Sequence, residues 1–182
     1  MIQREDTKHL FANSMHELSR QKTVEKITVV DITKNCSLSR ESFYYHFKDK
    51  YDLISWMFIT SFDIIMDRFN NYNDTWENSL IAFLKYLKAH VDFFSSALLD
   101  SKTNNFFDSF FSYTVDAMVK SVMARYSLNR LSEGWIFQLR FYAHGAVNMA
   151  TEWLIHKAPT TAEITAHSIV DSMSPLMREL FP

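Results

Sequence analysis

The sequence predicts an all-helical fold, and three observations support this prediction. The 182-residue chain contains only 2 glycines and 3 prolines, so the turn residues that sheets and long loops need are nearly missing. Apolar residues make up 47% of the chain, which is enough for a hydrophobic core. Apolar side chains also recur at spacings of three and four along most of the sequence, which is the period of an amphipathic helix.

Three short helices are predicted at the N-terminus. The first covers about residues 6–21. The second begins after Thr28, whose side chain can form a capping box with Asp31. The third runs through Phe47, and Ser39 can cap its start.

Longer helices follow, and we expect them at about residues 51–71, 75–98, 104–126, 132–157 and 161–180. Pro175 should kink or restart the last of them. The change from short to long helices predicts a boundary near residues 50–55. It divides the chain into a helix-turn-helix domain at 1–52 and a C-terminal helical bundle at 53–182.

Several classes of protein are disfavoured by composition and motifs. Residues 1–52 carry 9 basic and 8 acidic residues, so any DNA binding must depend on local placement of charge. The single cysteine excludes an internal disulfide, and no signal peptide or run of about eighteen apolar residues is found. We therefore expect a cytoplasmic protein with no membrane contact.

Catalytic and metal-binding motifs are also missing from the sequence. It has no glycine-rich phosphate loop, nucleophile elbow or paired-carboxylate motif, so we do not expect an enzyme or a cofactor. His90, His144 and His156 lack the close spacing of metal ligands, and no second cysteine supports them. No metal site is expected.

Residues 28–47 have the form of a helix-turn-helix, because two short helices are joined by a tight turn and the second opens with small polar and basic groups. In this motif the second helix enters the major groove of DNA, and its first residues meet base edges. Arginine can bind guanine through two hydrogen bonds, serine can serve several bases, and glutamate can accept from cytosine. The predicted base-reading residues are Ser39, Arg40, Glu41 and Ser42.

Contacts with DNA phosphates are expected from the residues that follow. Hydroxyl and ring N–H groups reach phosphates from this part of the helix, and the free N–H groups at the start of the next helix form a further phosphate site. The competing interpretation is a capped surface helix whose aromatic residues belong to the core. The predicted phosphate-binding residues are Tyr44, Tyr45, His46, Lys48 and Lys50.

The segment ITVVDITKNCSLSRESFYYHFKDKYDLI, residues 27–54, resembles the TetR family of bacterial transcription regulators. The resemblance implies a homodimer that binds a palindromic double-stranded DNA operator, with an effector-binding and dimerisation domain after the DNA-binding domain. It also implies that Phe43 and Phe47 pack beneath the recognition helix, and that Thr28 and Lys50 contact phosphates. Whether the regulator represses or activates stays open.

Two residues depart from the family pattern. Ser37 stands where the family often has a glycine in a left-handed conformation, which is costly for other residues. Glu41 stands where a small residue is common, so it can repel phosphates or accept a hydrogen bond from cytosine. A helical interaction scaffold that has lost DNA binding therefore remains an alternative.

The predicted helix 132–157 is apolar on two faces, so it needs its own core and a second partner. Together with the last helix it could form a four-helix bundle across a dimer, although a fully buried helix within one subunit is the other possibility. The candidate interface residues are Trp135, Leu139, Met149, Trp153, Ile169 and Met173.

The aromatic residues of the C-terminal part have two interpretations. They form either core alone or a pocket for a flat or apolar small-molecule effector. The candidate ligand-binding residues are Phe83, Tyr86, His90, Phe107, Phe111 and Tyr142.

The input to the regulator is also open to a second interpretation. The segment FYAHGAVNMATEWLIHKAPTTAEI, residues 141–164, resembles a side branch of the family that includes regulators of dihydroxyacetone kinase operons. Some members of that branch activate transcription. Control by a protein partner is therefore an alternative to a small molecule, and a poorly formed internal pocket would favour it.

Overall fold

The structure is a computed structural model that describes residues 4–71, 74–100 and 104–182. Within these ranges the chain forms ten α-helices and one 3-10 helix, and no strand is found among them. The predicted all-helical fold is confirmed. Among the described residues we find no helix that combines the length and the hydrophobicity of a membrane span.

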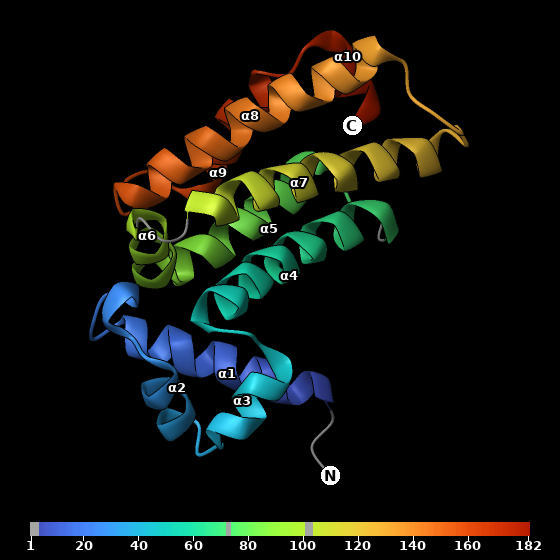
Figure 1. Cartoon of the computed structure of the whole chain (residues 1–182). Coiled ribbons are helices and arrows are strands. Elements are labelled where there is room, and N and C mark those ends of the chain that lie inside the picture. Colours follow the sequence, from blue (N-terminus) through green and yellow to red (C-terminus); the bar gives the residue numbers. More distant parts are fainter. Residues whose placement is uncertain (1–3, 72–73, 101–103) are drawn as a thin grey trace.

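The N-terminal helices form a small unit at one end of the molecule (Figure 1). Phe11 and Phe43 are fully buried at its centre, with their ring centroids 5.1 Å apart. This unit consists of α1 (Arg4–Ser19), the 3-10 helix η1 (Val24–Lys26), α2 (Val29–Asn35) and α3 (Arg40–His46).

The remaining helices form the C-terminal bundle, and α8 lies at the end farthest from α1–α3 (Figure 1). Within the bundle α4 packs on α5 and α7, α8 packs on α6 and α7, and α9 packs on α5. The bundle consists of α4 (Lys50–Asn71), α5 (Trp76–Ala89), α6 (Val91–Leu99), α7 (Asn104–Arg125), α8 (Glu133–Ile155), α9 (Ala162–Asp171) and α10 (Pro175–Leu180).

Side-chain caps determine where several bundle helices begin. In each of them a serine or threonine just before the helix accepts a hydrogen bond from the backbone N–H three residues later, at 3.1–3.3 Å. Each such cap stabilises its helix by about 1 kcal/mol. The capping residues are Thr75, Ser132, Thr161 and Ser174.

The prediction of one helix over residues 75–98 is wrong. The chain breaks at His90, whose backbone angles of φ −118° and ψ 31° end α5 and start α6. The break allows Phe93 and Phe94 of α6 to be buried, with the Phe94 ring 4.8 Å from the ring of Phe58 on α4. At the other end of the chain, Pro175 starts a new helix.

Candidate nucleic-acid interface

The turn between α2 and α3 has a left-handed residue at its centre. Ser37 has φ +56°, as expected for a position where a glycine is common. The turn is closed by backbone hydrogen bonds from the Ser37 N–H to the Lys34 carbonyl at 3.2 Å and from the Leu38 N–H to the Thr33 carbonyl at 2.9 Å. The strain of a non-glycine residue is therefore offset by local bonding, and the helix-turn-helix geometry is kept.

Helix α3 is capped at one end and anchored along one face. The Ser39 side chain accepts a hydrogen bond from the Ser42 N–H at 3.0 Å, which fixes the start of the helix. Phe43 and Phe47 are buried with 0% and 3% exposure, and both pack on Phe11. The prediction that these two phenylalanines pack is confirmed, and the opposite face of α3 points outward.

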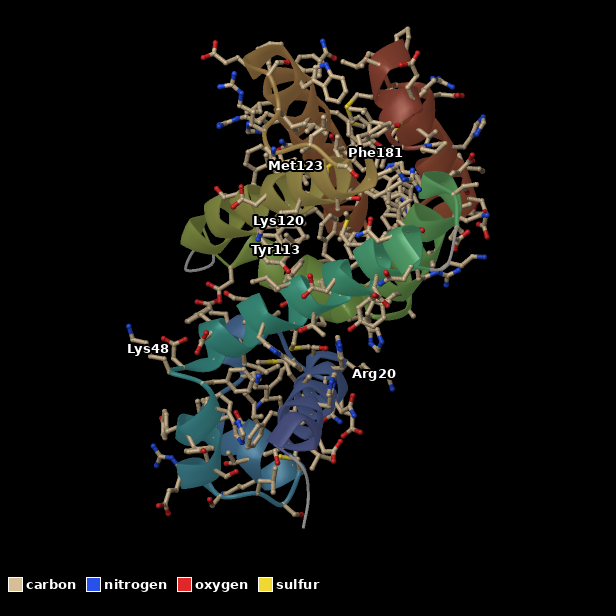
Figure 2. The ribbon with its side chains drawn as sticks, turned by 90° about the vertical axis from the view of Figure 1, so that its right-hand side faces the viewer. Arg20, Lys48, Tyr113, Lys120, Met123 and Phe181 are labelled. Atoms are coloured by element: carbon tan, nitrogen blue, oxygen red, sulfur yellow. The ribbon has the colours of Figure 1, made fainter. Side chains whose placement is uncertain are left out.

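The outward face of α3 combines aromatic and charged side chains. Tyr44 and Tyr45 are 50% and 67% exposed, which is unusual for tyrosines beside a core. The Arg40 guanidinium lies 5.9 Å from the centre of the Tyr44 ring, within the range of a cation–π contact. Glu41 is exposed on the same face, and Lys48 projects from the chain just after α3 (Figure 2). Tyrosine hydroxyls, a guanidinium and an ammonium group exposed together suit hydrogen bonding to DNA phosphates and base edges.

Two other predicted residues on α3 are only partly accessible. Ser42 is half-buried, and so is His46. The His46 ring lies 5.1 Å from the Tyr45 ring and 6.3 Å from the Phe11 ring, so it contributes to packing as well as to the surface.

The capping box at the start of α2 is formed as expected. Asp31 Oδ2 accepts the Thr28 N–H at 2.8 Å, and Thr28 Oγ1 accepts the Asp31 N–H at 3.2 Å. Hydrogen bonding to Lys22, together with the Thr28 backbone and side chain, lowers the pKa of Asp31 to about 2. Thr28 is exposed, but a phosphate contact through its N–H would have to displace this carboxylate.

The predicted phosphate site at the start of α4 needs correction. Lys50 Nζ donates to three carbonyl oxygens, those of Val24, Glu25 and Ile27, at 2.8–2.9 Å. An ammonium group has three N–H donors, so these bonds use all of them within the protein. Two of the N–H groups expected to be free at this helix end are also occupied, because Asp49 Oδ1 accepts from the N–H groups of residues 51 and 52 at 2.8 and 3.0 Å.

Two exposed lysines near the motif were not among the predicted contacts. Lys26 lies in η1 just ahead of α2, and Lys34 lies in the last turn of α2. Lysine is frequent between residues 22 and 34, which could have suggested DNA contacts. The frequency alone does not show which of these lysines face the DNA.

A small internal cavity of about 60 Å³ lies between α4, α5, α7 and α8. Phe83 and Tyr142, two of the predicted ligand-binding residues, line it together with Phe58, Phe62 and Phe110. Tyr142 accepts a hydrogen bond from Trp76 Nε1 at 3.0 Å, and burial raises its pKa to about 12. Ligand pockets usually measure about 300–1,000 Å³, so this cavity is too small for a typical metabolite.

Three of the other predicted ligand-binding residues lie away from the cavity. Tyr86 and His90 contact α1, where the His16 and His90 rings stack with centroids 3.8 Å apart. Burial, with His90 and Arg20 nearby, lowers the pKa of His16 to about 3, so this ring is neutral. The remaining two are Phe111, which stacks on His144 of α8, and Phe107, which lies outside the described side chains.

The candidate dimer residues divide between core and surface. Leu139 is fully buried and belongs to the core of the subunit. Trp153, Ile169 and Met173 are 5–7% exposed, so they are mostly core, but they also form part of the wall of a surface groove between α8 and α9. Trp135 is half-buried. Met149 is 57% exposed and lines a surface groove of about 910 Å³ between α8 and α9. Phe137 and Phe141, 65% and 71% exposed, line the same groove and were not predicted.

No group of three histidine, cysteine or acidic side chains within the described residues is placed to hold a metal ion.

Comparison with known proteins places this geometry among transcription regulators. A family model of the TetR type, described as "Transcriptional regulator C-terminal region", matches residues 74–175. The chain is 28% identical over 103 residues to the "HTH-type dhaKLM operon transcriptional activator DhaS" of Lactococcus lactis subsp. lactis (strain IL1403). That match covers 56% of this chain and 54% of the relative, so it spans about half the length of the relative.

Solved structures share the fold along nearly the whole chain. The dihydroxyacetone kinase operon activator DhaS superposes with a TM-score of 0.68 at 22% identity, covering 96% of both chains. A TetR transcriptional regulator from Streptococcus agalactiae 2603V superposes with a TM-score of 0.60 at 20% identity, covering 92% of this chain and 93% of the other.

Proposed function

Because the chain belongs to the TetR family of transcription regulators, we propose that it binds operator DNA by placing α3 in the major groove. In this proposal residues 1–52 are the DNA-binding domain and residues 53–182 are the regulatory and dimerisation domain. The protein acts in the cytoplasm, where the DNA is.

The observation that carries the proposal is the outward face of α3. A helix of 7 residues is fixed by the Ser39 cap and by buried Phe43 and Phe47, and it presents exposed Arg40, Tyr44 and Tyr45. Side chains at the start of such a helix read base edges, and those further along position it on the phosphates. Lys48 supplies a phosphate contact, whereas Lys50 and the start of α4 do not.

Selection of duplexes from a random DNA pool tests this function. The bound duplexes are sequenced, and the binding of the selected sequence is titrated against salt. We expect an inverted repeat whose half-sites lie about 34–36 Å apart or more. A salt-sensitive pool with no shared sequence, or no retained DNA, would favour an interaction scaffold instead.

The protein is further proposed to act as a homodimer through the outer face of α8. Phe137, Phe141 and Met149 lie along this face at 57–71% exposure, and Ile164 of α9 lies across the groove at 57%. Apolar side chains this exposed along one groove mark an interaction surface. A second copy of the chain is the partner that a two-fold operator requires.

Gly145 lies at the centre of this face and supports a proposal for the point at which two subunits would cross. An added Cβ at Gly145 would meet nothing within 4 Å, so the subunit itself has room for alanine. A glycine inside a helix is destabilising by roughly 0.5–1 kcal/mol relative to alanine. The close approach of a second backbone would explain the glycine, and we therefore place the α8–α8 crossing there.

An antiparallel crossing at Gly145 also pairs the neighbouring side chains well. A two-fold axis at this residue sets Phe141 opposite the partner's Met149, an aromatic–thioether contact. It sets Gln138 opposite the partner's Glu152. The Gln138 Oε1 accepts a hydrogen bond from Ser174 at 3.1 Å, so its amide N–H₂ group can donate to that carboxylate.

The input to the regulator has two candidates. A small-molecule effector would enter the aromatic cavity beside Phe83 and Tyr142, but it would have to open the present volume of about 60 Å³ several-fold. This small volume favours the second candidate, a protein partner that changes the affinity for the operator. Such a partner could make the regulator an activator, which is how the Lactococcus lactis relative is described.

A fractionation by size distinguishes a protein partner from a small-molecule effector. A cell extract is divided by a membrane that retains proteins, and each fraction is added to the regulator–operator complex. A change in operator affinity caused only by the retained fraction supports a protein partner. A change caused by the filtrate supports a small molecule.

A further inference from the structure

The 3-10 helix η1 is held by the C-terminal bundle at its first residue. The backbone N–H of Val24 donates to Ser96 Oγ of α6 at 2.7 Å. The Val24 side chain is fully buried, and η1 packs directly against α6. A short segment between α1 and α2 is thus attached to a helix more than seventy residues away in sequence.

The other side of η1 is held by α4. Lys50, the first residue of α4, binds the carbonyl oxygens of Val24 and Glu25 in η1 and of Ile27 just after it. Ile27 directly precedes Thr28, the N-cap of α2. The bonds that η1 makes therefore help to set the position of α2, and with it the turn to α3, together with α1, which packs on both α2 and α6.

Helix α6 is itself bonded to two other elements of the bundle. Lys157, just after α8, donates to Asp92 at 3.0 Å and to Ser95 at 2.8 Å. At the other end of α6, the Tyr51 hydroxyl of α4 donates to Asp100 Oδ2 at 3.1 Å. A shift of α8 that moves α6 would consequently also move η1.

We propose that η1 is the joint through which α6 sets the position of α3 relative to the C-terminal bundle. Ser96 and Lys50 are positioning residues in this joint, and they act through α2 without touching DNA. The joint gives the bundle a route to the recognition helix that runs from α6 to η1 directly, beside the covalent route through α4. Its use in regulation rests on the proposed function in DNA binding.

Distances between spin labels test the joint without DNA. In a Cys36→Ala background, labels are placed at the exposed positions Glu41 on α3 and Asp116 on α7, with unlabelled subunits in excess so that only distances within one chain are read. Ser96→Ala removes the acceptor of the Val24 N–H and should broaden the distance distribution. Ser96→Thr keeps a hydroxyl and should restore a narrow one.

Ser95→Ala is the matched control. Ser95 is the preceding residue of α6 and also loses a single hydroxyl, but its partner is Lys157 and not η1. Its distribution should stay narrow. Lys50→Met keeps the aliphatic stem and removes the ammonium, so it should broaden the distribution even if Ser96→Ala does not fold. Two results would overturn the proposed joint. One is a distance distribution that stays as narrow as in the parent protein in both Ser96→Ala and Lys50→Met. The other is a broadening in Ser95→Ala equal to that in Ser96→Ala.

Operator affinity then links the joint to function. Ser96→Ala should weaken binding to the selected operator by about 2- to 10-fold, the range expected for one hydrogen bond, and leave binding to random DNA unchanged. If the parent protein selects no operator while the distance distribution still broadens in Ser96→Ala, the proposed joint is supported and the proposed DNA reading is wrong.

Discussion

Replacing Gly145 by alanine should change the stability of the subunit and of the dimer in opposite directions. Gly145 lies in the interior of α8, far from both helix ends, and an added Cβ meets nothing within 4 Å. Alanine therefore gains the difference in helix propensity, about 0.5–1 kcal/mol in the free energy of unfolding of the subunit. For a chain of this size, that gain corresponds to an increase in Tm of about 1–4 °C.

The dimer should weaken because each subunit adds a methyl group at the proposed crossing. Extra methyl groups in a well-packed contact typically cost about 1–3 kcal/mol, and every 1.4 kcal/mol is tenfold in affinity. The dissociation constant of the dimer should therefore rise by roughly 5- to 150-fold.

Sedimentation velocity over a concentration series measures the dimer, and urea unfolding at concentrations where the variant is monomeric measures the subunit. Gly134→Ala is the control, since Gly134 is also exposed on α8 but lies near its first turn, far from the crossing. It should leave the dissociation constant unchanged. An unchanged or tighter dimer in Gly145→Ala would refute the proposed crossing.

Three further predictions concern the DNA-binding unit. Arg40→Ala should weaken operator binding by about 1–3 kcal/mol and relax the preference at one base pair, whereas Lys48→Ala should weaken all duplexes alike and lower the salt slope by about 1, both measured by fluorescence anisotropy. An equal loss on operator and random DNA for Arg40→Ala would exclude base reading. Thr28→Ala should reduce the free energy of unfolding by about 1 kcal/mol in urea at pH 6, and Thr28→Ser should not. Since the folded pKa of Asp31 is about 2, below the ordinary 3.8, its bonds stabilise the fold above pH 3.8 and are lost as the pH falls through 2, so the cost of Thr28→Ala should shrink there. The folded pKa of His16 is about 3, below the ordinary 6.5, so its contribution is complete above pH 6.5 and declines as the pH falls toward 3. The free energy of unfolding should decrease by on the order of 1–2 kcal/mol between pH 7 and pH 5. If the same decrease is measured in His16→Gln, it comes from other groups.

Features that depend on neighbouring residues could be predicted from the sequence. The capping box of Thr28 and Asp31 and the Ser39 cap both arise within four residues of the chain. The left-handed conformation at Ser37 was expected from the family pattern, which often has a glycine there. Burial of Phe43 and Phe47 was expected from the resemblance to the TetR family.

Features that depend on tertiary contacts could not be predicted. Lys50 is bound by carbonyl groups 23 to 26 residues earlier in the chain, so its charge suggested a phosphate contact that the fold does not leave available. The break at His90 has no glycine or proline to mark it, because packing of Phe93 and Phe94 determines it. The two apolar faces of α8 were visible, but only the packing of α6 and α7 shows that Leu139 faces inward and Phe141 outward.

The central claim is that a two-fold dimer reads an inverted repeat with α3. Its most direct test is an anisotropy titration on two duplexes that contain the same two selected half-sites at the same spacing, one as an inverted repeat and one as a direct repeat. We predict tight binding to the inverted repeat and binding to the direct repeat no stronger than to a scrambled duplex. Equal affinity for both arrangements would contradict the two-fold geometry, and equal affinity for all three duplexes would contradict sequence reading itself.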